Sequence, residues 1–248
     1  MESEAVRALV EVYYDVQKTR IAAEHRIRKA GEHGLSEASV EALMDWVGER
    51  MDKQEAELKA MVLKQIRDEP LWKEWLEGVK GVGPCIAGGL MAWVGDCSRF
   101  DTVSKLWAFA GMHVVDGEAP RRKRGEKANW NATLRTLCWK AGQSFVRVGD
   151  GYRDLYLQEK ARLRILHPEP IPFDPPRVKK ARPGDEGEPS EIMRFSDGHV
   201  DAMARRKVVK VFLGHYWEAA RKQAGLPTRE VYVIEHLGHT TPIPVVMR

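Results

Sequence analysis

Cysteine is scarce in this 248-residue chain, and long apolar runs are missing. The three cysteines, Cys85, Cys97 and Cys138, form no CxxC pair. An odd count without such a pair argues against a disulfide scaffold and against a cysteine-ligated zinc site. The first 30 residues show neither the apolar core of a signal peptide nor a membrane span. We therefore expect a soluble cytoplasmic protein that makes no contact with a membrane.

A strong excess of one charge sign is also missing. Lys and Arg number 40 and Asp and Glu 36, for a formal net charge of +4. So small a surplus is a weak indication of nucleic-acid binding, and the position of the cations matters more. Apolar residues make up 43% of the chain, which is enough for a hydrophobic core.

The apolar residues recur at helical spacing nearly throughout the chain. Residues 5–66 contain two runs with steps of three and four, one from Val6 to Ile27 and one from Val40 to Gln65. Such runs pack helix against helix. We predict an all-α fold that begins with a long antiparallel helical hairpin. This coiled-coil stalk either serves as a scaffold or joins copies of the chain into a homo-oligomer.

Polar and capping residues refine the predicted stalk. Ser36 is suited to cap the second helix, and Pro70 to end it. Arg20, Gln54 and Gln65 fall within the predicted seam, where polar side chains can set the register of the two helices.

After the stalk, the segment EGVKGVGPCIAGG places a glycine-rich turn between two predicted helices. Glycine permits positive φ angles, Pro84 favours the first turn of the second helix, and the small Ala87 allows the helices to cross closely. No strand precedes the glycines, which argues against a Rossmann site, and no Gly-Lys-Ser/Thr follows them, which argues against a P-loop. The pattern predicts a helix-hairpin-helix.

A helix-hairpin-helix turn can hold a phosphate of a nucleic-acid backbone without reading the bases. The amides of Gly81, Gly83 and Cys85 would face outward at a positive helix end, with Lys80 beside them. We therefore predict that these four residues bind nucleic acid.

A basic loop follows the hairpin. Its cations are Arg121, Arg122, Lys123, Arg124 and Lys127. A helix begins after it, with Asn129 or Asn131 as the expected cap and Arg135 in its first turns, so phosphates would meet another positive helix end. Trp130 either stacks on an exposed base or packs in the core.

The chain thus divides into four predicted segments. They are a stalk over 1–70, a helix-hairpin-helix domain over 71–165, a proline-rich linker over 166–197, and a basic helix with a tail over 198–248. The linker has seven prolines, so we expect neither helix nor strand in it. A helix from Val200 to Ala224, closed by Gly225, has a basic face that is either solvated surface or a further phosphate contact. Val231 to Ile234 resembles a short strand.

Two other chemistries are open on the sequence alone. Asp101 lies 18 residues after Gly83, the position at which a base-excision glycosylase would carry its catalytic aspartate, although Asp101 also suits a helix cap. Four histidines are concentrated in the last 50 residues: His199, His215, His236 and His239. No HExxH motif accompanies them, and His215 lies on an apolar helical face, so we predict no metal site.

The segment GVKGVGPCIAGGLMAWVGDCSRFDTVSKLWAFAGM, followed by NWNATLRTLCWKAG, resembles the C-terminal domain of the bridge-RNA-guided insertion-sequence transposases. The resemblance extends over about residues 5–150. Its most specific features are the Gly95-Asp96 to Arg99-Phe100 segment and the helix that carries Asn131, Leu134 and Arg135. It implies DNA binding, DNA recombination and a mobile-element origin, with branched DNA or RNA as further partners.

Two departures from that family bear on catalysis. The resemblance implies a four-carboxylate nuclease domain before the stalk, which this sequence does not contain, and a catalytic serine in the interval Met112 to Gly117, where no serine occurs. We therefore expect a catalytically degenerate, transposase-like binder with no cofactor of its own, or else a recombinase subunit that works with a separate nuclease, its Mg²⁺, or a guide RNA. The glycosylase that uses Asp101 is the third alternative.

Overall fold

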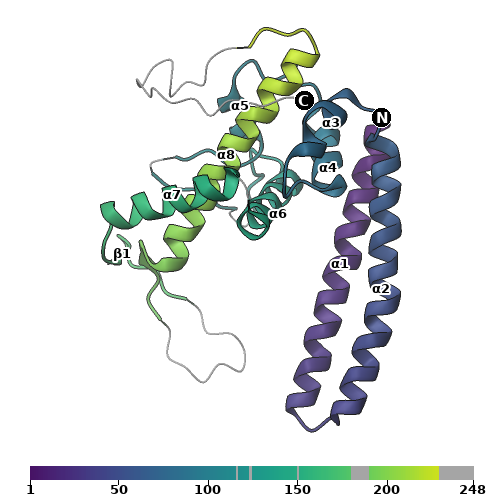
Figure 1. Cartoon of the computed structure of the whole chain (residues 1–248). Coiled ribbons are helices and arrows are strands. Elements are labelled where there is room, and N and C mark those ends of the chain that lie inside the picture. The colour runs from purple at the N-terminus through teal and green to yellow at the C-terminus, as the bar shows by residue number, and fades with distance from the viewer. Residues whose placement is uncertain (116, 123–124, 150, 180–189, 229–248) are drawn as a thin grey trace.

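The computed structural model describes residues 1–115, 117–122, 125–149, 151–179 and 190–228 (Figure 1). Helices dominate this part of the chain, as predicted, and the only named strands there form one two-stranded sheet. In chain order the elements are α1 (Ser3–Glu32), α2 (Glu37–Ile66), α3 (Pro70–Glu74), the 3₁₀ turn η1 (Leu76–Gly78), α4 (Pro84–Val94), α5 (Val103–Phe109), α6 (Ala132–Val148), α7 (Gly151–Leu166), β1 (Ile171–Pro172), β2 (Met193–Arg194) and α8 (Asp197–Gln223).

Helices α1 and α2 form the predicted antiparallel hairpin, which extends away from the other helices (Figure 1). Each has 30 residues, a length of about 45 Å at 1.5 Å per residue. The Ser36 side chain accepts a hydrogen bond from the Ser39 amide and caps α2, which confirms that prediction. Pro70 does not end α2, which stops at Ile66; it begins α3, where its missing N–H costs no helical hydrogen bond.

The predicted seam of α2 is wrong by one residue in its second half. Gln54 and Gln65 are exposed, and the residues after them, Glu55 and Ile66, are buried instead. A straight α-helix drifts by about 20° per heptad against a strict 3.5-residue repeat, so the buried face moves along the sequence. Arg20 of α1 does lie in the seam, where its Nε is 2.6 Å from Glu55 Oε1.

Helix α4 is the centre of the packing between the stalk and the remaining helices. Every residue from Cys85 to Val94 is buried. A Cβ on Gly88 would lie 2.7 Å from Val62 Cγ1 of α2, and one on Gly89 would lie 2.6 Å from Leu137 Cδ2 of α6. Both distances are shorter than carbon atoms tolerate, so the two glycines allow α4 to sit tightly between its neighbours. The base of the stalk therefore shares one hydrophobic core with the helices that follow.

Helix α8 packs against α6, α7 and α5 and is part of the same core. Trp217 Nε1 donates to the Phe100 carbonyl at 2.7 Å, and Tyr216 Oη to the Gly95 carbonyl at 3.0 Å. His215 is buried as predicted, with its Nδ1 2.6 Å from Tyr152 Oη. The first two bonds fix α8 against the loop between α4 and α5, and the third joins it to α7.

The proline-rich stretch does contain strands, contrary to prediction. Ile171 and Pro172 pair with Met193 and Arg194 in an antiparallel register, and the Ile192 amide donates to the Arg177 carbonyl at 2.7 Å. Proline is tolerated here because a two-stranded ribbon leaves one edge of each strand unpaired. The Phe173 side chain is buried and anchors the ribbon.

Two further sequence predictions concern a strand near the end of the chain and helices that could span a membrane. The strand predicted from Val231 to Ile234 lies outside the described residues. No helix in the described ranges combines the length and the apolar character needed to cross a lipid bilayer.

Candidate nucleic-acid interface

The glycine turn adopts the geometry that its sequence favours, with one difference. Gly81 has a φ of +90°, whereas Gly83 is extended, with φ −86° and ψ 175°. Gly83 is the N-cap of α4, and Pro84 is the first helical residue, as expected. The arm before the turn is α3 followed by η1 and not one continuous helix. A Cβ on Gly81 would lie 3.1 Å from Phe145 Cδ1, so the turn rests against the C-terminal end of α6.

Several backbone amides of this turn have no acceptor in the part of the chain that the structure describes. The Val82 amide donates to the Val79 carbonyl and the Ala87 amide to the Gly83 carbonyl, each at 3.0 Å. Among the described residues, no backbone or side-chain oxygen accepts from the amides of Gly81 or Gly83. Cys85 lies in the first turn of α4, where amides lack an intrahelical acceptor.

The side chains of the turn differ in what they can contribute. Lys80 is exposed. Burial raises the pKa of the Cys85 thiol to about 12, so the thiol stays protonated and only the amide of this residue can bind an anion. The turn thus presents free amides beside one cation and carries no nucleophile.

Two residues at the beginning of α6, Asn131 and Arg135, anchor the basic loop. Asn131, and not Asn129, caps α6 by accepting from the Leu134 amide at 2.8 Å. Arg135 Nη1 donates to the Pro120 carbonyl at 2.8 Å, and the Arg135 guanidinium lies 5.1 Å from the Trp130 ring. Burial lowers the pKa of Arg135.

The exposed cations of the loop differ in burial from Trp130, which follows them. Trp130 is half-buried against Gly111, where a Cβ would lie 2.8 Å from its Cδ1. This contact favours the packing role that the sequence left open for the tryptophan. Arg121, Arg122 and Lys127 are exposed, and the other two predicted cations of the loop, Lys123 and Arg124, lie outside the described residues.

The structure does not bring the glycine turn and the basic loop together. The turn lies beside Ser144 and Phe145, near the end of α6, and the loop leads into Asn131 at its beginning. Ser144 is 13 residues after Asn131, which corresponds to about 20 Å of helix. The two predicted contacts are thus separate points near opposite ends of α6.

Instead, the start of the basic loop meets a cationic cavity of about 440 Å³, which we call the basic groove. Its walls come from the loop after α5, from α7, from the ribbon and from α8. Its charged residues are Arg121, Arg162, Arg177, Arg194, Arg206, Lys207 and Lys210, with Glu118 and Glu159. Arg206, Lys207 and Lys210 belong to the basic face predicted for α8. Sequence reasoning missed Arg162, Arg177 and Arg194, because they are far apart in the chain and no local pattern joins them.

The groove is electrostatically unfavourable for further positive charge. Burial lowers the pKa of Lys210, and the neighbouring Lys207 and Arg206 lower it further. Burial likewise lowers the pKa of His199, with added repulsion from Arg194. Cations that depress one another's pKa values in this way favour an anion as the missing partner.

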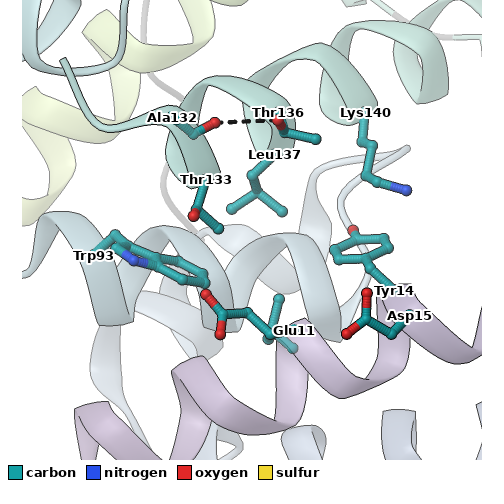
Figure 2. Close-up of a pocket in the computed structure, with 10 residues that line it drawn as sticks. Glu11, Tyr14, Asp15, Trp93, Ala132, Thr133, Thr136, Leu137 and Lys140 are labelled. Carbon is teal, nitrogen blue, oxygen red and sulfur yellow. Dashed lines mark hydrogen bonds between the residues drawn. The ribbon is translucent and has the colours of Figure 1, made fainter. Parts of the chain in front are cut away.

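A second cavity, of about 350 Å³, lies between the stalk, α4 and α6 (Figure 2). Its walls include Glu11 and Asp15 of α1 and Lys140 of α6, whose Nζ lies 3.8 Å from the centre of the Tyr14 ring. Two carboxylates against one cation make this cleft a poor place for a phosphate. Lys140 Nζ also donates to Gln17 Oε1 of α1 at 3.3 Å, so this lysine is engaged with the stalk.

The alternative catalytic residue lies apart from both cavities. Asp101 is exposed, and its Oδ1 is 2.8 Å from Lys105 Nζ. The helix cap that the sequence assigned to it belongs to Thr102, whose side chain accepts from the Lys105 amide. Asp101 lines neither of the cavities described above.

No cluster of three or more potential metal ligands occurs within the described ranges. His199 Nδ1 accepts from the Phe195 amide at 3.0 Å, and His215 is bonded to Tyr152. His236 and His239 lie outside the described residues.

We compared the sequence of the chain with known proteins and with models of protein families. No curated protein matches the chain. A family model does match part of it, from α3 through the glycine turn, the basic loop and α6 into the first half of α7. Residues 73–157 match the Transposase IS116/IS110/IS902 family, and this part of the chain is transposase-like.

Proposed function

We propose that the protein binds DNA through its backbone phosphates, with the glycine turn and the basic loop as two separate contacts. One observation carries the proposal: the amides of Gly81 and Gly83 have no acceptor among the described residues and lie beside the exposed Lys80, within the transposase-like segment. Free amides at a helix N-terminus suit phosphate oxygens. A spacing of about 20 Å along α6 corresponds to roughly six base pairs at 3.4 Å each, so one duplex can reach both contacts.

The same segment supports binding more than bond cleavage. No serine occurs between Ser104 and Ser144, the interval that includes the position at which the family resemblance implies a nucleophile. The glycosylase alternative is weaker, because Asp101 is paired with Lys105 and lines neither cavity. We infer a catalytically degenerate, transposase-like binder of duplex or branched DNA.

We also infer that the stalk joins copies of the chain. Trp46 is 56% exposed and Leu43 is 44% exposed, one helical turn apart on α2. Both lie toward the end of the stalk that is remote from α4 (Figure 1). Large apolar side chains that adjoin on a helix surface are typical of a contact with another helix.

The substitution Gly83→Ala tests the phosphate contact. A Cβ on Gly83 meets no atom within 4 Å, and its φ of −86° is allowed for alanine, so the fold should tolerate the change. The added methyl group lies where the DNA backbone must approach, so we expect duplex affinity to fall by about tenfold, which is ~1.4 kcal/mol. Fluorescence anisotropy with a labelled duplex and a labelled four-way junction measures the effect.

The matched control is Gly48→Ala on the exposed stalk, which should leave DNA affinity unchanged. If Gly83→Ala binds duplex and junction as tightly as the wild type, the turn is not the phosphate contact. Release of a base from a uracil-containing duplex that is abolished by Asp101→Asn would instead establish the glycosylase.

A further inference from the structure

The basic groove carries more positive charge than the described residues neutralise. Seven Arg and Lys residues line it, against two carboxylates. Arg177 is paired with Glu118 at 2.6 Å, and Arg162 with Glu159 at 2.7 Å. Among the described residues, no carboxylate pairs with the remaining five cations, which are Arg121, Arg194, Arg206, Lys207 and Lys210. An anion with several charges along its length would complete the groove.

Aromatic rings hold several of these cations in place. The Arg177 guanidinium lies 4.0 Å from the centre of the Phe173 ring, and the Arg194 guanidinium lies 5.1 Å from that of Phe195. Lys210 Nζ lies 4.2 Å from the centre of the Trp107 ring. An arginine that is stacked on a ring keeps a flat outer face, on which a nucleic-acid base can stack in turn.

The size of the groove limits what can enter it. A cavity of about 440 Å³ is in the range of sites for small molecules and single nucleotides. A double helix is far wider than such a cavity, whereas one unpaired strand can pass a nucleotide at a time through it. Positive grooves with stacking surfaces are the usual way in which proteins hold single strands.

We propose that the basic groove binds a single-stranded segment of nucleic acid, with its phosphates on the α8 cations Arg206, Lys207 and Lys210. The bases lie against the guanidinium planes of Arg177 and Arg194. This inference rests on the proposed function, because it adds an unpaired strand to a protein that grips a duplex. Of the seven cations that line the groove, six lie outside residues 73–157, and Arg121 lies within them.

The double substitution Lys207→Gln/Lys210→Gln tests the groove. Lys207 is exposed and Lys210 is half-buried, and neither makes an ion pair with a described residue, so the fold should be retained. Binding of labelled oligo(dT) and oligo(U) is followed by fluorescence anisotropy from low to moderate salt. Each lost phosphate contact lowers the log–log salt slope by about 0.7 for a single strand, so the double variant should lose about 1.4. The charge-matched control is Arg26→Gln/Lys53→Gln on the stalk, which should keep the wild-type slope.

A second variant acts in the opposite direction. Glu118→Gln removes the carboxylate that neutralises Arg177 and frees its guanidinium. We expect affinity for the single strand to rise by about two- to fivefold, the effect of one added charge at a partly exposed site. A decrease in affinity would count against the groove.

The outcomes separate this inference from the proposed function. Tighter binding of either oligo(dT) or oligo(U) by the wild type than by the double variant, with duplex affinity unchanged, supports the groove. An equal loss on single strand and duplex overturns it, because the groove would then be part of the duplex surface. Full competition by a mononucleotide at the same phosphate concentration also overturns it. If Gly83→Ala leaves duplex binding intact while the groove variants lose the single strand, the proposed function fails and the groove stands.

Discussion

Glycines of the turn differ in what a side chain would meet. At Gly81 the backbone has a positive φ of +90° and the space beside it is filled by Phe145 and Ser144. At Gly83 the backbone is extended and the space is open. The fold therefore constrains Gly81 to glycine, whereas at Gly83 only the proposed phosphate contact would do so.

We expect Gly81→Ala to destabilise the protein by about 1–3 kcal/mol, because alanine is strained at this φ and its Cβ would press on Phe145. Urea unfolding followed by circular dichroism measures the change. Gly83→Ala is the internal comparison and should shift the unfolding midpoint little. Equal midpoints for the two variants would contradict this assignment of roles.

At the scale of the element, the stalk depends on a polar contact in its middle. Glu55 is only 8% exposed, and the Arg20 guanidinium neutralises its carboxylate at 2.6 Å. The Arg20 pKa is raised, with the hydrogen bond to Glu55 as the largest cause. Arg20 therefore remains charged throughout the physiological pH range.

Replacement of Arg20 by alanine leaves a buried carboxylate without its partner. We expect a loss of about 1–3 kcal/mol in the free energy of unfolding. Arg28→Ala is the control, because Arg28 is exposed and its 3.3 Å pair with Glu24 is a surface contact worth less than about 1 kcal/mol. A thermal or urea midpoint for Arg20→Ala that equals that of Arg28→Ala would show that Glu55 is solvated in solution.

The elements also show what the sequence could and could not predict. Local signals were sufficient for the two stalk helices, for the Ser36 cap and for the Pro84 helix start, because each depends on neighbours within about four residues. They left Asn129 and Asn131 open as the cap of α6, and the structure selects Asn131. The ribbon was missed because proline-rich composition hides two-residue strands. The basic groove could not be found, because packing of α7, α8 and the ribbon joins cations from Arg121 to Lys210.

At the scale of the whole molecule, histidines make stability depend on pH. Burial is the largest cause that lowers the pKa of both His113 and His199 below the ordinary value of 6.5. The folded protein therefore binds fewer protons than the unfolded chain just below that pH. Their contribution to stability is complete above about pH 6.5 and is lost as the pH falls from there through the folded pKa values.

We expect the urea midpoint to fall between pH 7 and pH 5, and to fall less in His113→Phe. The phenyl ring removes a titrating group whose buried Nδ1 has no hydrogen-bond partner within the described residues. For each protein, the urea midpoint at pH 5 is subtracted from that at pH 7, and the two differences are compared. An identical difference in the wild type and the variant would show that His113 does not contribute.

The whole molecule also has a surface suited to a second copy. We expect Trp46→Glu to shift the protein to a smaller species in size-exclusion chromatography with light scattering, because a charge would replace an exposed apolar ring. Glu49→Gln, one turn away and exposed, is the control. A wild type that is monomeric at all concentrations would remove the stalk as an oligomer contact.

The close fit of Gly88 against Val62 has a mechanical consequence. Because α2 and α4 are in close contact, a force that tilts the stalk, which is about 45 Å long, would also move α4, the helix that begins at Pro84. If the stalk joins copies and the glycine turn binds DNA, as proposed, assembly of the stalk would alter the affinity for DNA.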